Sequence, residues 1–175
     1  MTIKTIFLDR DGVINKEINY LNKIEDFEFI KGVFNACQYF KNLGYEIIII
    51  TNQSGISKGY YDESDFQNLT KWMLSQFKKN NISILDIFFC PHSPDFNCYC
   101  RKPKPGMFFN AKKKYNIDMG NSWMIGDKNT DIIAANESGI NKTILVKSGH
   151  KIIESPTKAT YILDSIADSI KVIMN

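Results

Sequence analysis

The chain has 175 residues, enough for one domain with a full hydrophobic core. Its composition, 43% hydrophobic and 23% charged, is that of a globular protein, and its net charge of +3 comes from scattered lysines, so disorder and nucleic-acid binding are both disfavoured. No stretch approaches the about 20 apolar residues that span a bilayer, and the N-terminus lacks the apolar core of a signal peptide, so we expect a cytoplasmic protein without membrane contact.

Strands and helices are predicted to alternate along the chain. After Glu46 the predicted strand 46–50 is continuously apolar, which is typical of a strand buried on both faces of a parallel sheet. Asp62 is a good helix N-cap with Asp65 three residues on. The predicted strands span 3–8, 46–50, 85–89, 123–125, 143–146 and 161–163, and the predicted helices span 31–43, 62–80, 106–115, 130–138 and 164–173. This alternation predicts one α/β, Rossmann-like domain over residues 1–175, with a mostly parallel sheet and helices on both faces.

Two segments lack a regular pattern. Residues 15–30 form a loop of a length that is uncommon unless it has a function, so it is a candidate for contacting substrate. Residues 90–105 are rich in proline and are also expected to be irregular. Cys37, on the apolar side of the helix predicted over 31–43, is expected to be a buried core thiol.

Polar residues follow three of the predicted strands. Asp9 and Asp11 follow the first strand, Thr51 and Asn52 the second, and Asp127 the fourth. The carboxyl ends of parallel strands meet at one edge of the sheet, where open α/β sheets bind ligands. We therefore expect these five side chains to form one site.

The residue types at this edge point to phosphoryl transfer. Three carboxylates repel one another unless a cation lies among them, and an all-oxygen ligand set suits Mg²⁺. Arg101 and Lys102 supply the positive charge that a phosphate needs. In Asp9-Arg10-Asp11 the aspartates point the same way, so one can attack phosphorus while the other handles the proton. An isolated Asp-x-Asp is more often a solvated turn, but here its partners follow in order.

Three of the four cysteines crowd into eleven residues together with a histidine. The ligands Cys90, His92, Cys98 and Cys100 suit tetrahedral Zn²⁺ with every position filled by protein, which is typical of a structural site. Such a zinc-bound loop, residues 90–100, would place Arg101 and Lys102. The alternative is three free thiols and a surface histidine. His150 is expected to be a surface loop residue rather than a ligand.

These motifs resemble those of the haloacid dehalogenase (HAD) phosphatase superfamily. Asp9-Arg10-Asp11-Gly12, Thr51-Asn52, Lys102 and Gly126-Asp127 stand in the superfamily's order and spacing, and the resemblance covers nearly the whole chain. The stretches 7–15, 51–56 and 100–103 are similar to one subfamily, that of the heptose bisphosphatases and histidinol phosphatases. The resemblance implies a HAD-like fold, and no insertion is long enough for a large cap domain.

The resemblance also implies a role for each matching residue. Asp9 would be the nucleophile and Asp11 the general acid/base, while Thr51 and Lys102 would stabilise the transferring phosphoryl group. Mg²⁺ would be held by Asp9, Asp127 and the main-chain carbonyl of Asp11, and the subfamily's zinc supports the cysteine site. The implied substrate contacts are Glu17, Ile18, Asn19, Tyr20, Thr51, Asn52, Gln53, Ser54, Arg101, Lys102 and Lys128.

Two residues near these motifs are less clear. Asp131 is either an indirect partner of the metal site or a first-turn carboxylate favoured by the helix dipole. Arg10 is expected on the opposite side of its segment from the aspartates, facing away from the phosphate and supporting the loop.

The expected function is Mg²⁺-dependent hydrolysis of the 7-phosphate of a heptose 1,7-bisphosphate, for the synthesis of nucleotide-activated heptose. The alternative within the subfamily is histidinol-phosphate hydrolysis. The non-enzymatic alternatives are a phospho-acceptor domain and a zinc-loop binding module. A phospho-acceptor domain needs no acid/base residue two positions after its acceptor, so Asp11 argues against that alternative. We expect a monomer whose partner is a small sugar phosphate.

Overall fold

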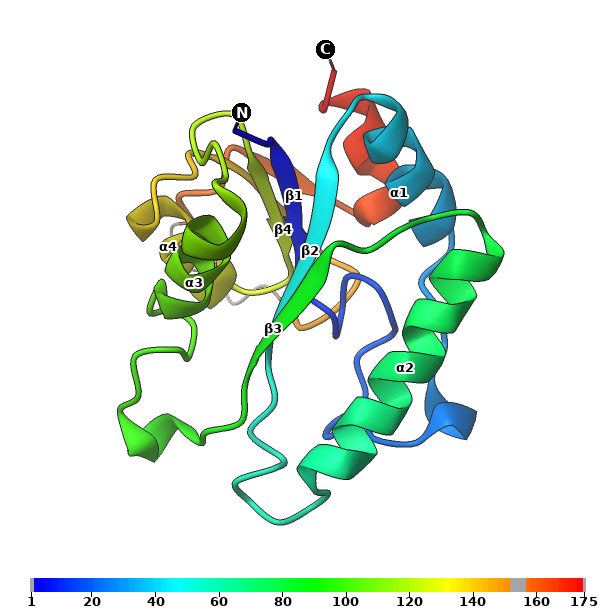
Figure 1. Cartoon of the computed structure of the whole chain (residues 1–175), viewed down its shortest axis with the longest axis vertical. Helices are drawn as coiled ribbons and strands as arrows, with labels where there is room; N and C mark the ends of the chain where they lie inside the picture. The colour runs from blue at the N-terminus through cyan, green and yellow to red at the C-terminus, as the bar shows by residue number, and fades with distance from the viewer. Residues whose placement is uncertain (1, 152–156, 175) are drawn as a thin grey trace.

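Six strands form one parallel sheet in the computed structural model, which describes residues 2–151 and 157–174. The strand order is β3-β2-β1-β4-β5-β6, and every neighbouring pair is parallel, as the sequence predicts. The strands span Thr5–Leu8 (β1), Glu46–Asn52 (β2), Asp86–Cys90 (β3), Trp123–Gly126 (β4), Lys142–Val146 (β5) and Tyr161–Leu163 (β6). The first strand therefore lies in the middle of the sheet, between β2 and β4 (Figure 1).

Helices cover both faces of this sheet, which confirms the predicted α/β architecture. The α-helices span Val33–Asn42 (α1), Glu63–Lys79 (α2), Gly106–Tyr115 (α3) and Asn129–Glu137 (α4), and short 3-10 helices span Ile24–Asp26 (η1), Pro94–Phe96 (η2) and Ile166–Lys171 (η3). Helices α1 and α2 lie on one side of the sheet, whereas α3 and α4 lie on the other (Figure 1).

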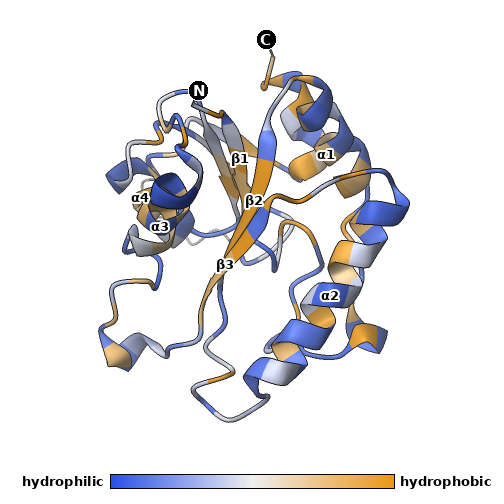
Figure 2. Ribbon diagram, viewed as in Figure 1, coloured by the Kyte–Doolittle hydropathy of each residue, from blue (hydrophilic) through white to orange (hydrophobic). Residues whose placement is uncertain are grey.

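Each face of the sheet has its own hydrophobic core because side chains alternate along a strand. Ile6 and Leu8 of β1 pack in the core beneath α1 and α2, whereas Phe7 packs in the core beneath α3 and α4. The strands are accordingly almost continuously apolar, while α2 is apolar only along its inner side (Figure 2). Cys37 is fully buried in the first core, as expected.

The C-terminal segment differs from the prediction. Residues 164–173 were expected to form an α-helix, but they contain the 3-10 helix η3, whose N-cap Ser165 accepts a hydrogen bond from Ala167 N at 3.3 Å. Short helical segments commonly take this tighter form, and packing on α1 sets this one in place. Strand β2 is longer than predicted, so Thr51 and Asn52 still pair with β3.

No helix among residues 2–151 and 157–174 is long and apolar enough to cross a membrane. The carboxyl ends of β1, β2 and β4 lie side by side at one edge of the sheet, and the predicted site residues are at this edge.

Candidate active site

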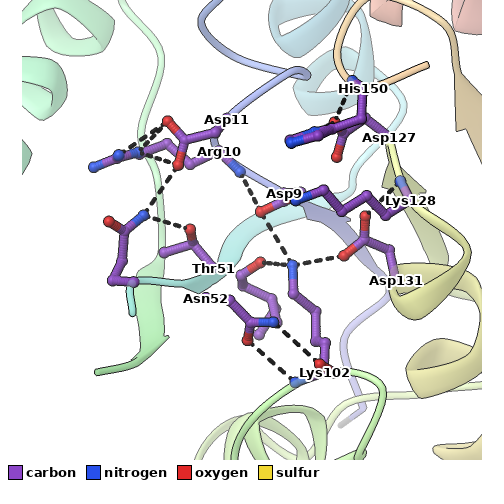
Figure 3. Close-up of polar contacts among 12 residues, drawn as sticks. Asp9, Arg10, Asp11, Thr51, Asn52, Lys102, Asp127, Lys128, Asp131 and His150 are labelled. Carbon is purple, nitrogen blue, oxygen red and sulfur yellow. Dashed lines mark hydrogen bonds and ion pairs between the residues drawn. The ribbon is translucent and has the colours of Figure 1, made fainter. Parts of the chain in front are cut away.

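The predicted site residues meet at the carboxyl edge of the three central strands. Asp9 follows β1, Asp127 follows β4, and Thr51 is near the end of β2. Asp9 is placed by its own backbone, because its N–H donates to Ile125 O at 3.0 Å. The five side chains expected at this edge therefore lie close together, around a sixth, Lys102 (Figure 3).

Lys102 lies at the centre of the site and is only 3% exposed. Its Nζ lies 3.0 Å from Asp9 Oδ1 and 2.7 Å from Asp131 Oδ1, and it donates to Ile50 O at 2.7 Å. Burial alone would lower the pKa of Lys102, but the two carboxylates raise it above its ordinary value. The ammonium is therefore permanently charged beside Asp9.

Asn52 lines the cleft and also holds the backbone of Lys102 in place. Its side-chain amide donates to Lys102 O at 3.1 Å, and its Oδ1 accepts from Lys102 N at 3.1 Å. This two-point contact fixes a loop residue against the end of β2. Asn52 thereby aims the lysine at Asp9.

Asp9 is buried but keeps access to the cleft, with 8% of its surface exposed. Burial raises its pKa to about 6, and Lys102 opposes that effect. Arg10 N donates to Asp9 Oδ1 at 2.8 Å. At neutral pH the carboxylate is therefore largely ionised and held in one orientation.

Asp11 is surrounded by hydrogen-bond donors. Arg10 Nη2 lies 2.9 Å from Asp11 Oδ1, Asn15 Nδ2 donates to the same oxygen at 3.0 Å, and Gln53 Nε2 donates to Oδ2 at 3.1 Å. Burial raises the pKa of Asp11, but Arg10 and these hydrogen bonds lower it overall. In this structure Asp11 is therefore ionised.

The prediction for Arg10 was only partly right. Its side chain supports the loop, because Nη2 donates to Leu21 O at 3.2 Å. It does not turn away from the aspartates, however, since it pairs with Asp11 and is 2% exposed. Alternation along an extended segment failed here because the chain turns immediately after Asp9.

Three carboxylates at this edge fit a divalent cation. Oxygens of Asp9, Asp127 and Asp131 lie within 4.8 Å of one another. Asp127 Oδ1 is buried and has no hydrogen-bond partner among the described residues, so this oxygen is available to a cation. Burial and the charge of Asp9 both raise the pKa of Asp127. A bound cation would favour the ionised form of this carboxylate and so offset both effects. Oxygen ligands of this kind suit Mg²⁺.

A glycine permits the close approach that this group requires. Gly12 has a φ of +86°, and a Cβ at this position would collide with the Asp127 carboxylate. The Asp-x-Asp-Gly motif thus needs its glycine both for the left-handed turn and for space beside Asp127 at the end of β4.

The alternatives for Asp131 are not exclusive. Its Oδ2 accepts a hydrogen bond from Lys128 N at 3.0 Å and so satisfies the first turn of α4. Its Oδ1 pairs with Lys102, which makes the same residue a partner of Asp9 through the ammonium. Both readings of the sequence therefore describe real contacts.

His150 lies in the loop after β5 and is partly exposed, as expected, but it also contacts a residue of the site. Its main-chain N–H and its ring Nδ1 lie 2.9 and 2.7 Å from Asp127 Oδ2, and its Nε2 lies 3.6 Å from Glu17 Oε1. Burial and the charge of Asp11 raise the pKa of Glu17 to about 7, with His150 opposing them. Sequence reasoning missed this contact because the loop after β5 carries no motif.

A cleft of about 330 Å³ opens above these residues. Of the predicted substrate contacts, Thr51 is 1% exposed and does not line it. The other ten line the cleft: Glu17, Ile18, Asn19, Tyr20, Asn52, Gln53, Ser54, Arg101, Lys102 and Lys128.

Other lining residues were not among the predicted substrate contacts. They include Lys58, Tyr61, Pro94, Thr130 and His150. Lys58 donates to the Tyr20 hydroxyl at 2.8 Å and so joins the loop after β2 to the loop after β1. The only signal for these residues was their position in the sequence: most lie in loops that follow strands, and Thr130 lies in the first turn of α4.

The cysteine cluster has the shape of a tetrahedral metal site. Sγ of Cys100 lies 3.0 Å from that of Cys90 and 3.4 Å from that of Cys98, and 3.4 Å from His92 Nδ1. A zinc ion with Zn–S bonds of about 2.3 Å would separate such ligands by roughly 3.8 Å, so small shifts suffice. Arg101 Nη1 donates to His92 O at 3.0 Å, which ties the cluster to the cleft.

The chain resembles known phosphatases over most of its length. A family model of HAD-hydrolase-like proteins matches residues 99–169. D-glycero-alpha-D-manno-heptose-1,7-bisphosphate 7-phosphatase of Photorhabdus laumondii is 53% identical, over 89% of this chain and 88% of that protein. The D-glycero-beta-D-manno-heptose-1,7-bisphosphate 7-phosphatase of Vibrio cholerae is 44% identical, over 96% of this chain and 95% of that protein.

A solved structure agrees with these relatives. The crystal structure of D,D-heptose 1,7-bisphosphate phosphatase from B. bronchiseptica, complexed with magnesium and phosphate, has a TM-score of 0.88 and 27% identity, and covers 97% of both chains. With its carboxylate edge, central lysine and capless cleft, this chain belongs to the heptose-1,7-bisphosphate 7-phosphatase family of HAD hydrolases.

Proposed function

We propose that this protein hydrolyses the 7-phosphate of D-glycero-α-D-manno-heptose 1,7-bisphosphate, leaving heptose 1-phosphate. The observation that carries the chemistry is the buried contact of 3.0 Å between Lys102 Nζ and Asp9, beside the unpartnered oxygen of Asp127. The family supplies the substrate class. The anomer is inferred from two relatives in one organism, Photorhabdus laumondii, of which the alpha enzyme is 53% and the beta enzyme 41% identical to this chain.

In the first step a carboxylate oxygen of Asp9 attacks phosphorus, and the bond from phosphorus to the C7 oxygen breaks. Asp11 gives a proton to that oxygen, so heptose 1-phosphate leaves as an alcohol. Lys102 stabilises the charge on the transferring phosphoryl group at the cleft, and Thr51, buried beside it at the end of β2, would add to that stabilisation. Because the pKa of Asp11 is lowered in the free protein, Asp11 must take up a proton from water as substrate binds before it can give one to the leaving oxygen.

In the second step water attacks the aspartyl-phosphate. Asp11 now takes a proton from the water, the bond from phosphorus to Asp9 breaks, and phosphate leaves. Mg²⁺ held by Asp9, Asp127 and the main-chain carbonyl of Asp11 would supply positive charge against the phosphoryl oxygens. The ionised state of Asp11 suits it to this second proton transfer.

We also propose that Cys90, His92, Cys98 and Cys100 hold one structural Zn²⁺, and that the protein acts as a monomer on a small sugar phosphate. The four ligand atoms lie within 4.8 Å of one another, which supports the zinc site. The sugar contacts would come from Glu17–Tyr20, Ser54, Arg101 and Lys128, all of which line the cleft.

The test compares kcat/KM on the α- and β-anomers of heptose 1,7-bisphosphate and on histidinol phosphate. We expect a preference of at least about tenfold for the α-anomer, the size that a few polar contacts provide. A preference for the β-anomer would overturn the proposed anomer specificity. A preference for histidinol phosphate would overturn the proposal that the substrate is a heptose bisphosphate. Asp9→Asn is the control: phosphate release undiminished in this variant would exclude catalysis by the site described.

A further inference from the structure

Tyr61 is a buried tyrosine whose hydroxyl faces the catalytic edge. It is 6% exposed, and its ring packs so closely on Gly55 that a Cβ at that glycine would collide with it. Tyr60 N donates to Gly55 O at 3.0 Å and closes the loop that delivers Tyr61. The hydroxyl donates to Gln53 Oε1 at 2.5 Å.

Gln53 uses its side-chain amide entirely within the protein. Its Nε2 donates to Asp11 Oδ2 at 3.1 Å and to Thr51 Oγ1 at 2.8 Å, and only 3% of the residue is exposed. The two N–H bonds of the amide thus face Asp11 and Thr51, while its oxygen faces the Tyr61 hydroxyl. The Tyr61 hydroxyl, by donating to the amide oxygen, holds the amide in that orientation.

The contact from Gln53 differs in kind from the other contacts to Asp11. Arg10 and Asn15 belong to the same segment as Asp11 and move with it. Gln53 belongs to the loop directly after β2, the strand whose last two residues are Thr51 and Asn52. Among the described residues, its amide is the one side-chain donor that joins the Asp11 carboxylate to the second strand end.

We propose that Tyr61 and Gln53 are positioning residues, which lock the acid/base Asp11 to the phosphoryl-stabilising Thr51 across two strand ends. The sequence resemblance implied that Gln53 contacts substrate, whereas its buried, fully used amide assigns it this other role. The proposal rests on the proposed function only in taking Asp11 as the residue that exchanges the proton.

Leaving-group chemistry separates such positioning from a merely structural role. When the P–O bond of an alkyl ester breaks, the alkoxide needs a proton, so the O–H bond of Asp11 breaks as one forms on the leaving oxygen. A p-nitrophenolate leaves readily without that proton. Misplacing Asp11 therefore slows hydrolysis of an alkyl phosphate more than that of p-nitrophenyl phosphate.

The experiment measures kcat/KM of the metal-loaded protein on heptose 1,7-bisphosphate, a hexose 6-phosphate and p-nitrophenyl phosphate. We expect Tyr61→Phe to lower the value about tenfold for the two alkyl esters and less than about twofold for the aryl ester, a fraction of the general-acid contribution. Gln53→Met should lower kcat/KM about 100-fold for the alkyl esters and about tenfold for the aryl ester, because Thr51 also loses its hydrogen-bond partner. Asp11→Asn should give the same pattern in its strongest form.

Tyr45→Phe is the matched control. Tyr45 is also buried, at 5% exposure, but it lies just before β2 at the opposite edge of the sheet. Its hydroxyl makes no hydrogen bond to another residue of the described chain, so all three substrates should be hydrolysed as by the wild type.

Equal losses on alkyl and aryl esters in Tyr61→Phe, or no loss on the alkyl esters, would overturn the proposal. The mild Tyr61→Phe change keeps this decision open even if Gln53→Met fails to fold. A wild type that favours the hexose phosphate over the heptose, with the selective loss intact, would overturn the substrate assignment alone.

Discussion

At the scale of single residues, Lys102 organises the charges of the site. Its ammonium is shared by Asp9 and Asp131, and all three side chains are nearly inaccessible to water. Removing one partner from a buried ion pair leaves an uncompensated charge, which is more damaging than the loss of the pair itself. The stability of the free protein and its chemistry therefore depend on the same contact.

We predict that Lys102→Met lowers the free energy of unfolding by about 3 kcal/mol and abolishes turnover. Adding Asp131→Asn should recover part of that free energy, because it removes the charge of one of the two carboxylates, Asp9 and Asp131, that have lost Lys102. Turnover should remain absent. Urea unfolding of the metal-free single and double variants measures this. A double variant less stable than Lys102→Met would contradict the shared-charge argument.

The sequence identifies these residues better than it predicts their contacts. Asp9, Thr51 and Asp127 could be placed because a strand ends at or beside each, and parallel strands share an edge. The contacts of Gln53 and His150 could not be predicted. The direction of a loop side chain depends on distant neighbours, such as Tyr61 for Gln53 and Asp127 for His150.

At the scale of elements, the loop of residues 91–105, which joins β3 to α3, carries most of the proposed zinc site. It contains only the three-residue helix η2 as regular structure, yet it carries Arg101 and Lys102 into the cleft. Its own apolar side chains are partly exposed, with Phe96 at 65% and Tyr99 at 60%. A metal is therefore the natural source of its order.

We predict one equivalent of zinc per chain by elemental analysis. Removing it, by a chelator or by Cys98→Ser, should lower kcat/KM at least about tenfold and lower the thermal midpoint, because the loop no longer holds Arg101 and Lys102. Cys37→Ala is the matched control, since Cys37 is buried in the other core. That variant should lose stability but keep its zinc. A zinc-free protein with full activity would refute the structural role.

Asp86 joins β3 to α3 through its charge. Lys114 Nζ and the Tyr115 hydroxyl each donate to its Oδ2 at 2.8 Å. Partial burial raises the pKa of Asp86, but the hydrogen bonds from Lys114, Tyr115 and Ile87 N lower it below its ordinary value. A carboxylate with a lowered pKa in the folded state stabilises the fold above its unfolded pKa and ceases to do so as the pH falls.

We therefore predict that Asp86→Asn lowers the free energy of unfolding by about 0.5–1 kcal/mol at neutral pH. The difference from the wild type should persist down to about pH 5 and vanish as the pH falls through the lowered pKa of the folded state, below about 3.9. Denaturant titrations at several pH values measure it. Asp168→Asn, which removes a more local pair with Lys171, should have a smaller effect. A difference that grows in acid would contradict the sign.

At the scale of the whole molecule, the architecture could be predicted because both faces of the sheet are buried. A continuously apolar run such as 47–50 has no polar face toward solvent, and this indicates helices on both sides of the sheet. The order of the strands did not follow from the pattern. It depends on which crossovers the helices make, and one sequence carries no direct record of that.

The two cores share strands β1, β2, β3 and β4, and this sets how the molecule should unfold. Phe7 belongs to one core while its neighbours Ile6 and Leu8 belong to the other, so neither core can open without disturbing β1. Both tryptophans, Trp72 and Trp123, report on the core beneath α1 and α2.

Far-ultraviolet circular dichroism, in contrast, reports on all helices, including α3 and α4 on the other face. We predict that tryptophan fluorescence and circular dichroism give coincident unfolding curves for the zinc-loaded protein, as expected of a single cooperative unit. Ile48→Ala, in the core that contains neither tryptophan, should shift both curves equally, with a loss of about 2–5 kcal/mol. The two curves should shift together because a shared strand cannot remain folded on one side of the sheet only. A shift of the circular dichroism curve alone would show that the two faces unfold as separate units.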